Sequence, residues 1–304
     1  MSGILTHSSM TCAKTCLKRY WWSYIKGYRK AKKSEALTVG TLFHDSLEAG
    51  RVIDDPGYPV WCTTDEDFLA WDTTYAIASG MAEAYLEYWK DDAVTYVQKE
   101  AGFKFAIPNP ETTGISRNFK AAGKIDGVVI WRGKTCIMEH KTVGVGISPT
   151  DDYWLKLAMD QQISMYLLGA MSLGHDVSNT VIYDVCRRPG IRPKQIKGER
   201  ETPEQFKERL VDDMRTRPEF YFARREVVRF PKDLNAFADE LWMMQRLLSE
   251  CKNNNWWVRN TSQCNLTWRC EYLDVCLEDG LECPDGFEVI DNVHPELAGL
   301  LKEV

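Results

Sequence analysis

The sequence predicts an α/β fold, a mixed sheet flanked by helices, and its clearest sign is a central hairpin. Two apolar runs, Ile125–Trp131 and Lys134–Met138, flank Arg132-Gly133, as in antiparallel strands joined by a two-residue loop. Thr95–Ile107 alternates as a further strand, and the β-branched run Val177–Arg187 predicts one beside the hairpin. A last strand is predicted over residues 219–230, and helices over residues 75–90, 151–173, 203–215 and 231–253.

Length and composition limit the class of protein. The chain has 304 residues, 44% hydrophobic and 27% charged, enough for one large globular domain or a core with a cap. It has no apolar run approaching the roughly eighteen residues of a membrane span, and its first residues do not form a signal peptide. We therefore expect a cytoplasmic protein without a membrane partner. The net charge of −6 argues against a surface coated in basic residues, but not against basic residues gathered around one channel.

The register of the hairpin brings two carboxylates together. If Trp131 pairs with Lys134 next to the loop, Asp126 lies opposite Glu139. Two carboxylates facing each other across a ladder repel and destabilise the sheet, unless a cation sits between them. Mg²⁺ is bound through one or two carboxylates together with waters and substrate phosphates. The pair therefore predicts a divalent-metal site, and the alternative is a solvated hairpin face of mixed charge.

Alternation along the second strand places Glu139 and Lys141 on one face and His140 on the other. A lysine beside a metal can hold a phosphate or position the attacking water. The combination suits metal-assisted phosphodiester hydrolysis.

Gly-Lys-Ile-Asp126 followed by Glu139-His-Lys141 resembles the core of the PD-(D/E)XK nuclease superfamily, and more narrowly its RecB and Cas4-like branch, which carries an iron–sulfur cluster. The resemblance implies a restriction-endonuclease-like sheet and a Mg²⁺- or Mn²⁺-dependent deoxyribonuclease. We expect a DNA exonuclease acting on single strands or ends. The alternatives are a structure-specific or single-strand endonuclease and a non-catalytic Cas4-like adaptor that holds DNA.

The resemblance also assigns metal ligands. Gly40 and His44 match the Gly-x-x-x-His motif of this branch, in which the histidine binds the metal, although a lone helical histidine is more often structural. An imidazole tightens the binding of Mn²⁺ relative to an all-oxygen site. The implied ligands are His44, Asp126, Glu139 and the carbonyl of His140, and Lys141 would orient the water.

Gln162 and Tyr166 match the QxxxY motif of the same branch, about twenty residues after Glu-His-Lys. Their spacing places both side chains on one helix face. The resemblance implies that they contact DNA or brace the site near Lys141. Glu100 either supports the site or lies on a solvated strand face.

Two basic segments are candidates for DNA contact. Residues 7–33 interleave aromatic and basic side chains, with Ser8 or Ser9 as a helix N-cap, and residues 187–197 form a basic loop with two prolines. Both can instead be solvated surface. The expected DNA contacts are Arg19, Tyr20, Trp21, Lys26, Arg187, Arg188 and Arg192.

Three of the ten cysteines, Cys264, Cys270 and Cys276, are spaced as metal-binding thiolates, without the CxxC pairs that zinc sites favour. The resemblance implies a [4Fe–4S] cluster whose fourth ligand is Cys16. Only Cys270-x5-Cys276 keeps the family spacing, so Cys12 and Cys283 remain alternative ligands.

The resemblance covers most of the chain. It implies a single nuclease domain over residues 1–304, with a catalytic core at about 94–190 and an iron–sulfur-stapled helical cap from about 1–50 and 231–283. Relatives of this kind act in recombination or CRISPR adaptation, and some form rings. Partner proteins from those processes and a homo-oligomer are therefore further expectations.

Overall fold

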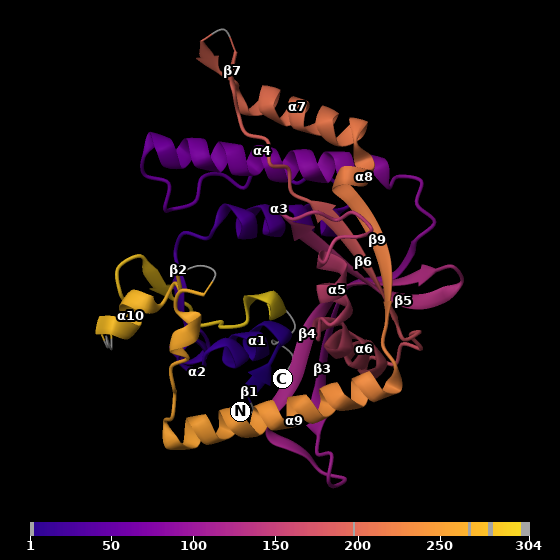
Figure 1. The fold of residues 1–304 in the computed structure, drawn as a ribbon, viewed down its shortest axis with the longest axis vertical. Coiled ribbons are helices and arrows are strands. Elements are labelled where there is room, and N and C mark those ends of the chain that lie inside the picture. The colour runs from indigo at the N-terminus through magenta and orange to yellow at the C-terminus, as the bar shows by residue number, and fades with distance from the viewer. Residues whose placement is uncertain (1–2, 197, 267–268, 279–281, 299–304) are drawn as a thin grey trace.

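A six-stranded mixed sheet forms the centre of the computed structural model, which describes residues 3–196, 198–266, 269–278 and 282–298 (Figure 1). β4 pairs with β1 and with β5 along one edge, at different residues, and with β3 along the other edge, while β6 and β9 follow β5. β5 is antiparallel to β4 but parallel to β6, so the mixed sheet is confirmed. The strands are β1 (Gly3–Leu5), β3 (Thr95–Pro108), β4 (Ile115–Trp131), β5 (Lys134–Val143), β6 (Thr180–Arg187) and β9 (Phe222–Val228).

The central hairpin has the predicted loop and register. Trp131 pairs with Lys134, and the ladder continues to Gly127 opposite Met138. Arg132 and Gly133 have φ of 50° and 76°, the left-handed conformation that a two-residue type I′ loop requires at both positions.

Helices cover both faces of the sheet, as Figure 1 shows. On one side Phe43, Met81 and Leu210 pack with Phe222 of β9, and on the other Phe103 of the sheet lies among apolar helix side chains. The first layer contains α3 (Glu35–Ala49), α4 (Asp65–Tyr88) and α7 (Pro203–Thr216), and the second contains α1 (His7–Thr15), α6 (Gln162–Ser172) and α9 (Pro231–Asn254). None of the helices in the described ranges is both long and apolar enough to cross a membrane.

Two helices begin at residues other than those that the sequence predicts, because capping hydrogen bonds determine where they start. α4 begins at Asp65, ten residues before the predicted start, because the Thr64 hydroxyl accepts from the amide of Asp67. α1 is capped by Thr6, which exchanges hydrogen bonds with Ser9, and not by Ser8 or Ser9.

Two predicted elements are interrupted. The helix expected over 151–173 is divided into α5 (Tyr153–Ala158) and α6, because Asp160 between them accepts from the amide of Gln162 and starts a new helix. The strand expected over 219–230 begins with a helical turn, α8 (Pro218–Tyr221), since Pro218 is preset for the first turn of a helix.

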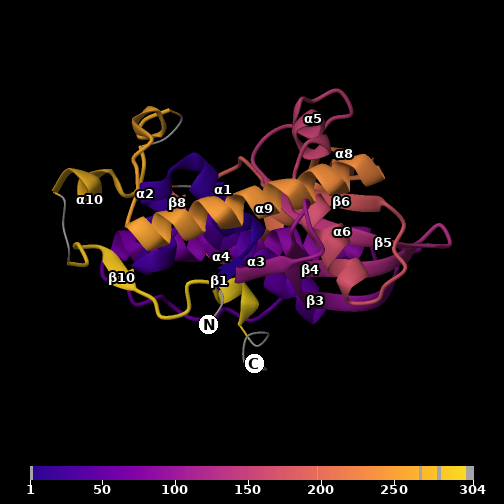
Figure 2. The ribbon, with the colours of Figure 1, turned by 90° about the horizontal axis from the view of Figure 1, so that it is seen from below.

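Residues from both ends of the sequence form a smaller unit, here called the terminal lobe (residues 16–30, 257–266, 269–278 and 282–298). β2 (Tyr28–Lys30) pairs with β10 (Phe287–Val289), and Trp22 packs with Tyr272 in a small core. Figure 2 shows α10 and β10 at the end of the molecule opposite β5. The remaining elements are α2 (Leu17–Tyr20), a π-helix at Trp21–Ile25, α10 (Leu273–Glu278), β7 (Gln195–Ile196), β8 (Glu199–Arg200) and 3₁₀ turns at Thr261–Gln263 and Pro295–Leu297.

Candidate active site

The site lies at a break along one edge of β4. β1 pairs with residues 119–121 and β5 with residues 127–131, while β3 follows the opposite edge, so residues 122–126 separate two strand partners. The register is the predicted one, but the ladder stops at Gly127 and Met138, one pair before Asp126 and Glu139, so these two residues are not ladder partners. Instead the Asp126 carboxylate accepts a hydrogen bond from the amide of His140 at 2.8 Å, which holds Asp126 at the strand junction.

Lys141 joins the hairpin to α6. Its Nζ donates to Glu139 Oε1 at 2.7 Å and to Gln162 Oε1 at 2.5 Å, and Gln162 Nε2 donates to Tyr166 Oη at 2.7 Å. Glu139 and Lys141 thus share a face, as alternation predicts, and the spacing of Gln162 and Tyr166 brings both side chains to it. Tyr166 is buried, and its hydroxyl holds the Gln162 amide in position.

Glu139 is a buried carboxylate with one oxygen left unsatisfied. Its side chain is 3% exposed, and within the described part of the chain its Oε2 atom has no hydrogen-bond partner. Burial, and then the charge of Asp126, raise its pKa to about 7 against the opposing effect of Lys141. Burial likewise raises the pKa of Asp126. Two buried carboxylates with an orphaned oxygen fit a divalent cation, which accepts such oxygens as ligands.

His44 reaches the same carboxylates from α3. A Cβ at Gly40 would lie 3.1 Å from Thr142 Oγ1, so glycine permits α3 to lie against β5. His44 Nδ1 lies 3.9 Å from Asp126 Oδ1. Burial, and then His140, lower the pKa of His44 to about 4. The imidazole is therefore neutral near pH 7, the state in which histidine binds metals.

The His140 ring occupies the opposite face of β5. Its Nε2 lies 3.1 Å from the Tyr96 hydroxyl and its Nδ1 3.4 Å from Asp184 Oδ2. Arg224 donates to the same Asp184 oxygen at 2.8 Å. Burial opposes protonation, but Asp184 holds the pKa of His140 above its usual value. The backbone amide of His140 thus contacts Asp126, while its ring is held by Tyr96 and Asp184, with its centre 6.3 Å from that of the His44 ring.

Sequence reasoning missed this buried network, although one signal was present. Asp184 is the only charged residue in the otherwise apolar run Val181–Cys186, and a buried charge needs a partner. Glu100 forms an ion pair with Lys124 and has a φ of 48°. It lies opposite Asp126 in the register of β3 and β4, between the pairs Lys99–Gly127 and Ala101–Ile125.

The model of the PD-(D/E)XK nuclease superfamily matches residues 4–277. The chain belongs to this superfamily. Similar solved structures include SSO0001, at 12% identity and a TM-score of 0.36, covering 81% of this chain and 78% of that one. Another is a protein of Eubacterium rectale provisionally named an exonuclease, at 14% identity and a TM-score of 0.44, covering 93% of this chain and 90% of that one. The comparison with curated proteins finds no match.

The N-terminal basic segment of this PD-(D/E)XK chain is partly packed. Tyr20 is 3% exposed and stacks on Tyr24 and Trp257, so its ring is held in the core and is not presented to a base. Arg19 pairs with Glu271 at 2.9 Å. Trp21 is half-buried, and the ammonium group of Lys26 lies 5.1 Å from the centre of its ring.

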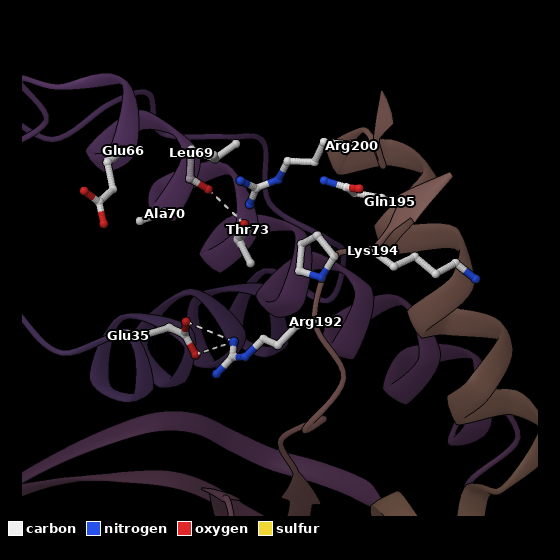
Figure 3. A pocket seen from close by; sticks show the side chains of 10 residues that line it. Glu35, Glu66, Leu69, Ala70, Thr73, Arg192, Lys194, Gln195 and Arg200 are labelled. Carbon is white, nitrogen blue, oxygen red and sulfur yellow. Dashed lines mark hydrogen bonds and ion pairs between the residues drawn. The ribbon is translucent and has the colours of Figure 1, made fainter. Parts of the chain in front are cut away.

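The basic loop lies against the α3–α4 layer. Arg192 forms two hydrogen bonds with Glu35, at 2.9 and 3.0 Å, beside a cavity of about 530 Å³ (Figure 3). Arg187 covers the Phe220 ring at 4.0 Å, and the amide of Arg188 donates to Val143. Lys197, the last residue of the predicted loop, lies outside the described residues.

The candidate cluster cysteines come from segments that lie together in the terminal lobe. Cys16 Sγ accepts from the amide of Asn260 at 3.3 Å, and Cys276 Sγ accepts from Trp22 Nε1 at 3.2 Å. The amide of Cys270 donates to the carbonyl of Cys264 at 2.8 Å. Over the ranges that the structure describes, however, no three His, Cys, Asp or Glu side chains are arranged to ligate one ion. The segments are gathered, but their thiols are not in ligand geometry.

Proposed function

We propose that this chain is a divalent-metal-dependent DNA exonuclease of the RecB and Cas4-like kind, acting on single strands or DNA ends. The observation that carries the proposal is the buried pair of Asp126 and Glu139, in which Lys141 satisfies only one of the two Glu139 oxygens. A superfamily of nucleases implies DNA as the substrate. The provisional name of the Eubacterium rectale protein is in keeping with exonuclease action.

Each residue of the site has a chemical task in this proposal. Asp126, Glu139, His44 and the His140 carbonyl would hold Mg²⁺ or Mn²⁺. The bound ion lowers the pKa of a water and stabilises negative charge on the scissile phosphate and the leaving oxygen. Lys141 orients the water for in-line attack on phosphorus, and Gln162 and Tyr166 hold Lys141 in place. The water oxygen forms a bond to phosphorus as the bond between phosphorus and the leaving oxygen breaks. The water loses one proton to solvent, and the leaving oxygen takes up a proton from solvent.

The test is digestion of end-labelled linear and of circular single-stranded DNA, with Mn²⁺ and with EDTA. Metal-dependent loss of the linear form alone supports the exonuclease. Cutting of the circle replaces it with the single-strand endonuclease. DNA binding without cleavage favours the non-catalytic adaptor. The Asp126→Asn protein, prepared in the same way, controls for contaminating nucleases.

Replacing Gln162 by alanine is expected to lower the cleavage rate on the order of 100-fold. In this variant Lys141 would still donate to Glu139 but would lose Gln162 as its second acceptor. A small displacement of a catalytic group lowers a reaction rate by about this factor. The rate is measured with saturating Mn²⁺. Gln98→Ala is a matched control, because Gln98 is exposed and its amide contacts His175. An unaltered rate for Gln162→Ala would remove this residue from the site.

The iron–sulfur cluster is part of the same proposal. Cys16, Cys264, Cys270 and Cys276 supply soft thiolates, and the Trp22 and Asn260 N–H groups that reach two of them are donors of the kind that stabilise thiolate sulfur. The cluster would supply a cross-link between the two ends of the chain. Cys12, whose pKa burial raises to about 11, and the exposed Cys283 remain the alternative ligands.

Iron and acid-labile sulfide content, measured on protein purified without oxygen, tests the cluster. Cys276→Ser is expected to lose most of the iron and to lower the melting temperature. Cys283→Ser is expected to retain both, and Cys12→Ser likewise. Iron loss in either of the last two would reassign the ligand, and protein without iron in every preparation would refute the cluster.

The cellular setting belongs to the proposal as well. We propose a single nuclease domain, a cytoplasmic location, and action as a homo-oligomer or with recombination or CRISPR-adaptation proteins. Light scattering on the purified protein measures the oligomeric state.

A further inference from the structure

Three neighbouring cavities lie between the terminal lobe and the basic loop. The first, of about 430 Å³, lies between α1, the π-helix and Glu271. The second, of about 830 Å³, is lined by residues 29–37 and by Glu271 and Glu288. Arg29 and Glu271 line both of these, and Glu35 lines the second and the 530 Å³ cavity of Figure 3. Shared wall residues therefore make the three cavities neighbours in a series.

The first cavity begins beside the active site. His7, on its wall, has Nε2 3.6 Å from Asp160 Oδ1. The same carboxylate oxygen accepts from the amide of Gln162 at 2.9 Å, and Gln162 accepts from Lys141. A molecule that leaves Lys141 along this wall meets His7 and then the cavity.

Basic side chains outnumber acidic ones along the series. The first two cavities carry Arg19, Arg29, Lys30, Lys32 and Lys33 against Glu35, Glu271 and Glu288. The third adds Arg192, Lys194 and Arg200 against Glu66 (Figure 3). The whole chain has a net charge of −6, so this positive lining is local. Such a concentration of charge attracts a polyanion.

Arg29 and Lys33 have charge available for a ligand. Arg29 donates to the backbone carbonyls of Ser23, Tyr28 and Val293, at 2.7, 3.2 and 3.4 Å, and no carboxylate in the described ranges forms an ion pair with it. Its guanidinium lies 4.9 Å from the centre of the Tyr24 ring, so charge and an aromatic face adjoin. Lys33 is exposed, and no hydrogen bond or ion pair holds it within the same ranges.

We propose that the three cavities form a track for one strand of DNA, in which Arg29 and Lys33 bind phosphates of the part of the strand beyond the active site. The proposal rests on the nuclease function above and names its substrate as a single strand. Each cavity has the volume of a small-molecule pocket, roughly 300–1,000 Å³, which is on the scale of single nucleotides. Basic grooves with adjoining aromatic rings are typical of single-strand binding.

The test is fluorescence anisotropy of a labelled oligothymidylate of about 15 nucleotides in EDTA, over a range of salt concentrations. Arg29→Gln and Lys33→Gln should each weaken binding several-fold and reduce the slope of log K against log salt by about 0.7. Arg29→Lys should restore the slope, because it restores the charge. Lys90→Gln makes the same charge change at an exposed residue outside the three cavities and should bind as the parent does.

Unaltered affinity and slope in both glutamine variants would overturn the track, as would tighter binding of a duplex of the same length. If circular dichroism shows that Arg29→Gln does not fold, Lys33→Gln decides alone, because this side chain is exposed. Binding in EDTA does not depend on cleavage. If the binding effects are seen but the parent protein never cleaves DNA with Mn²⁺, the nuclease function is refuted and the track is not. If the parent cleaves DNA but both glutamine variants bind as the parent does, the track is refuted and the nuclease function is not.

Discussion

Replacing Asp126 by asparagine is expected to lower metal-dependent DNA cleavage by about three orders of magnitude and to leave the metal-free protein at least as stable as the parent. Loss of a charged ligand removes several kcal/mol of stabilisation of the transition state, and each 1.36 kcal/mol corresponds to tenfold in rate. The asparagine oxygen can still accept from the His140 amide. In addition, a buried carboxylate beside Glu139 disappears, so the repulsion that raises the pKa of Glu139 is relieved.

The two measurements are the cleavage rate with Mn²⁺ and the melting temperature in EDTA. Asp176→Asn removes the same charge from an exposed position and should alter neither. A parent-like cleavage rate for Asp126→Asn would contradict the proposed metal site. A large fall in melting temperature would instead mean that Asp126 has a structural role which the parent needs without metal.

The second large effect concerns stability against pH in EDTA. The pKa of Glu139 rises from its usual value of 4.5 to about 7 in the folded protein, so between these values the folded state holds more protons than the unfolded state. Stability from this group is therefore present below pH 4.5 and is lost as pH rises to 7. Over this range the free energy of unfolding of the parent falls by about 3 kcal/mol relative to that of Glu139→Gln, whose side chain at this position cannot titrate.

The comparison with Glu139→Gln is needed because His44 acts in the opposite direction. Its lowered pKa gives stability that is lost as pH falls from 6.5 towards 4, and its side chain is 34% exposed, so the effect is smaller. The contribution of His44 is largely common to both proteins and cancels in their difference. Denaturant midpoints of the two proteins between pH 4.5 and 8 measure that difference. Parallel curves would contradict a raised pKa, and Mn²⁺ should stabilise the parent above pH 7 by binding the folded state.

Local chemistry explains why so much of the hairpin could be predicted. A two-residue loop determines the register of both strands, and alternation along the second strand then places Glu139 and Lys141 on one face. The end of the ladder could not be predicted in this way. Beyond the ladder the same edge of β4 pairs with β1, through residues 3–5, and nothing near Asp126 in the sequence indicates that distant strand.

Packing decides between side chains that the sequence does not distinguish. Tyr20 and Trp21 are neighbouring aromatic residues, yet the first is buried in the core and the second is half-exposed. The partners of His140 come from two other strands, β3 and β6, and Arg224 of β9 pairs with one of them, Asp184, so their meeting is a product of the fold. Burial and long-range partners, not residue type, separate structural from functional side chains here.

The pairing of β2 with β10 has a consequence for how the protein is made. Residues 28–30 gain their strand partner only when residues 287–289 have been synthesised, and residues 3–5 wait for residues 119–121. At roughly 5–20 residues per second on the ribosome, the first delay is on the order of ten to fifty seconds. During that time Trp22 and Tyr28 lack the side chains that later bury them. The terminal lobe is thus the last part of the protein to become native, and nascent chains are most exposed to chaperones and proteases there.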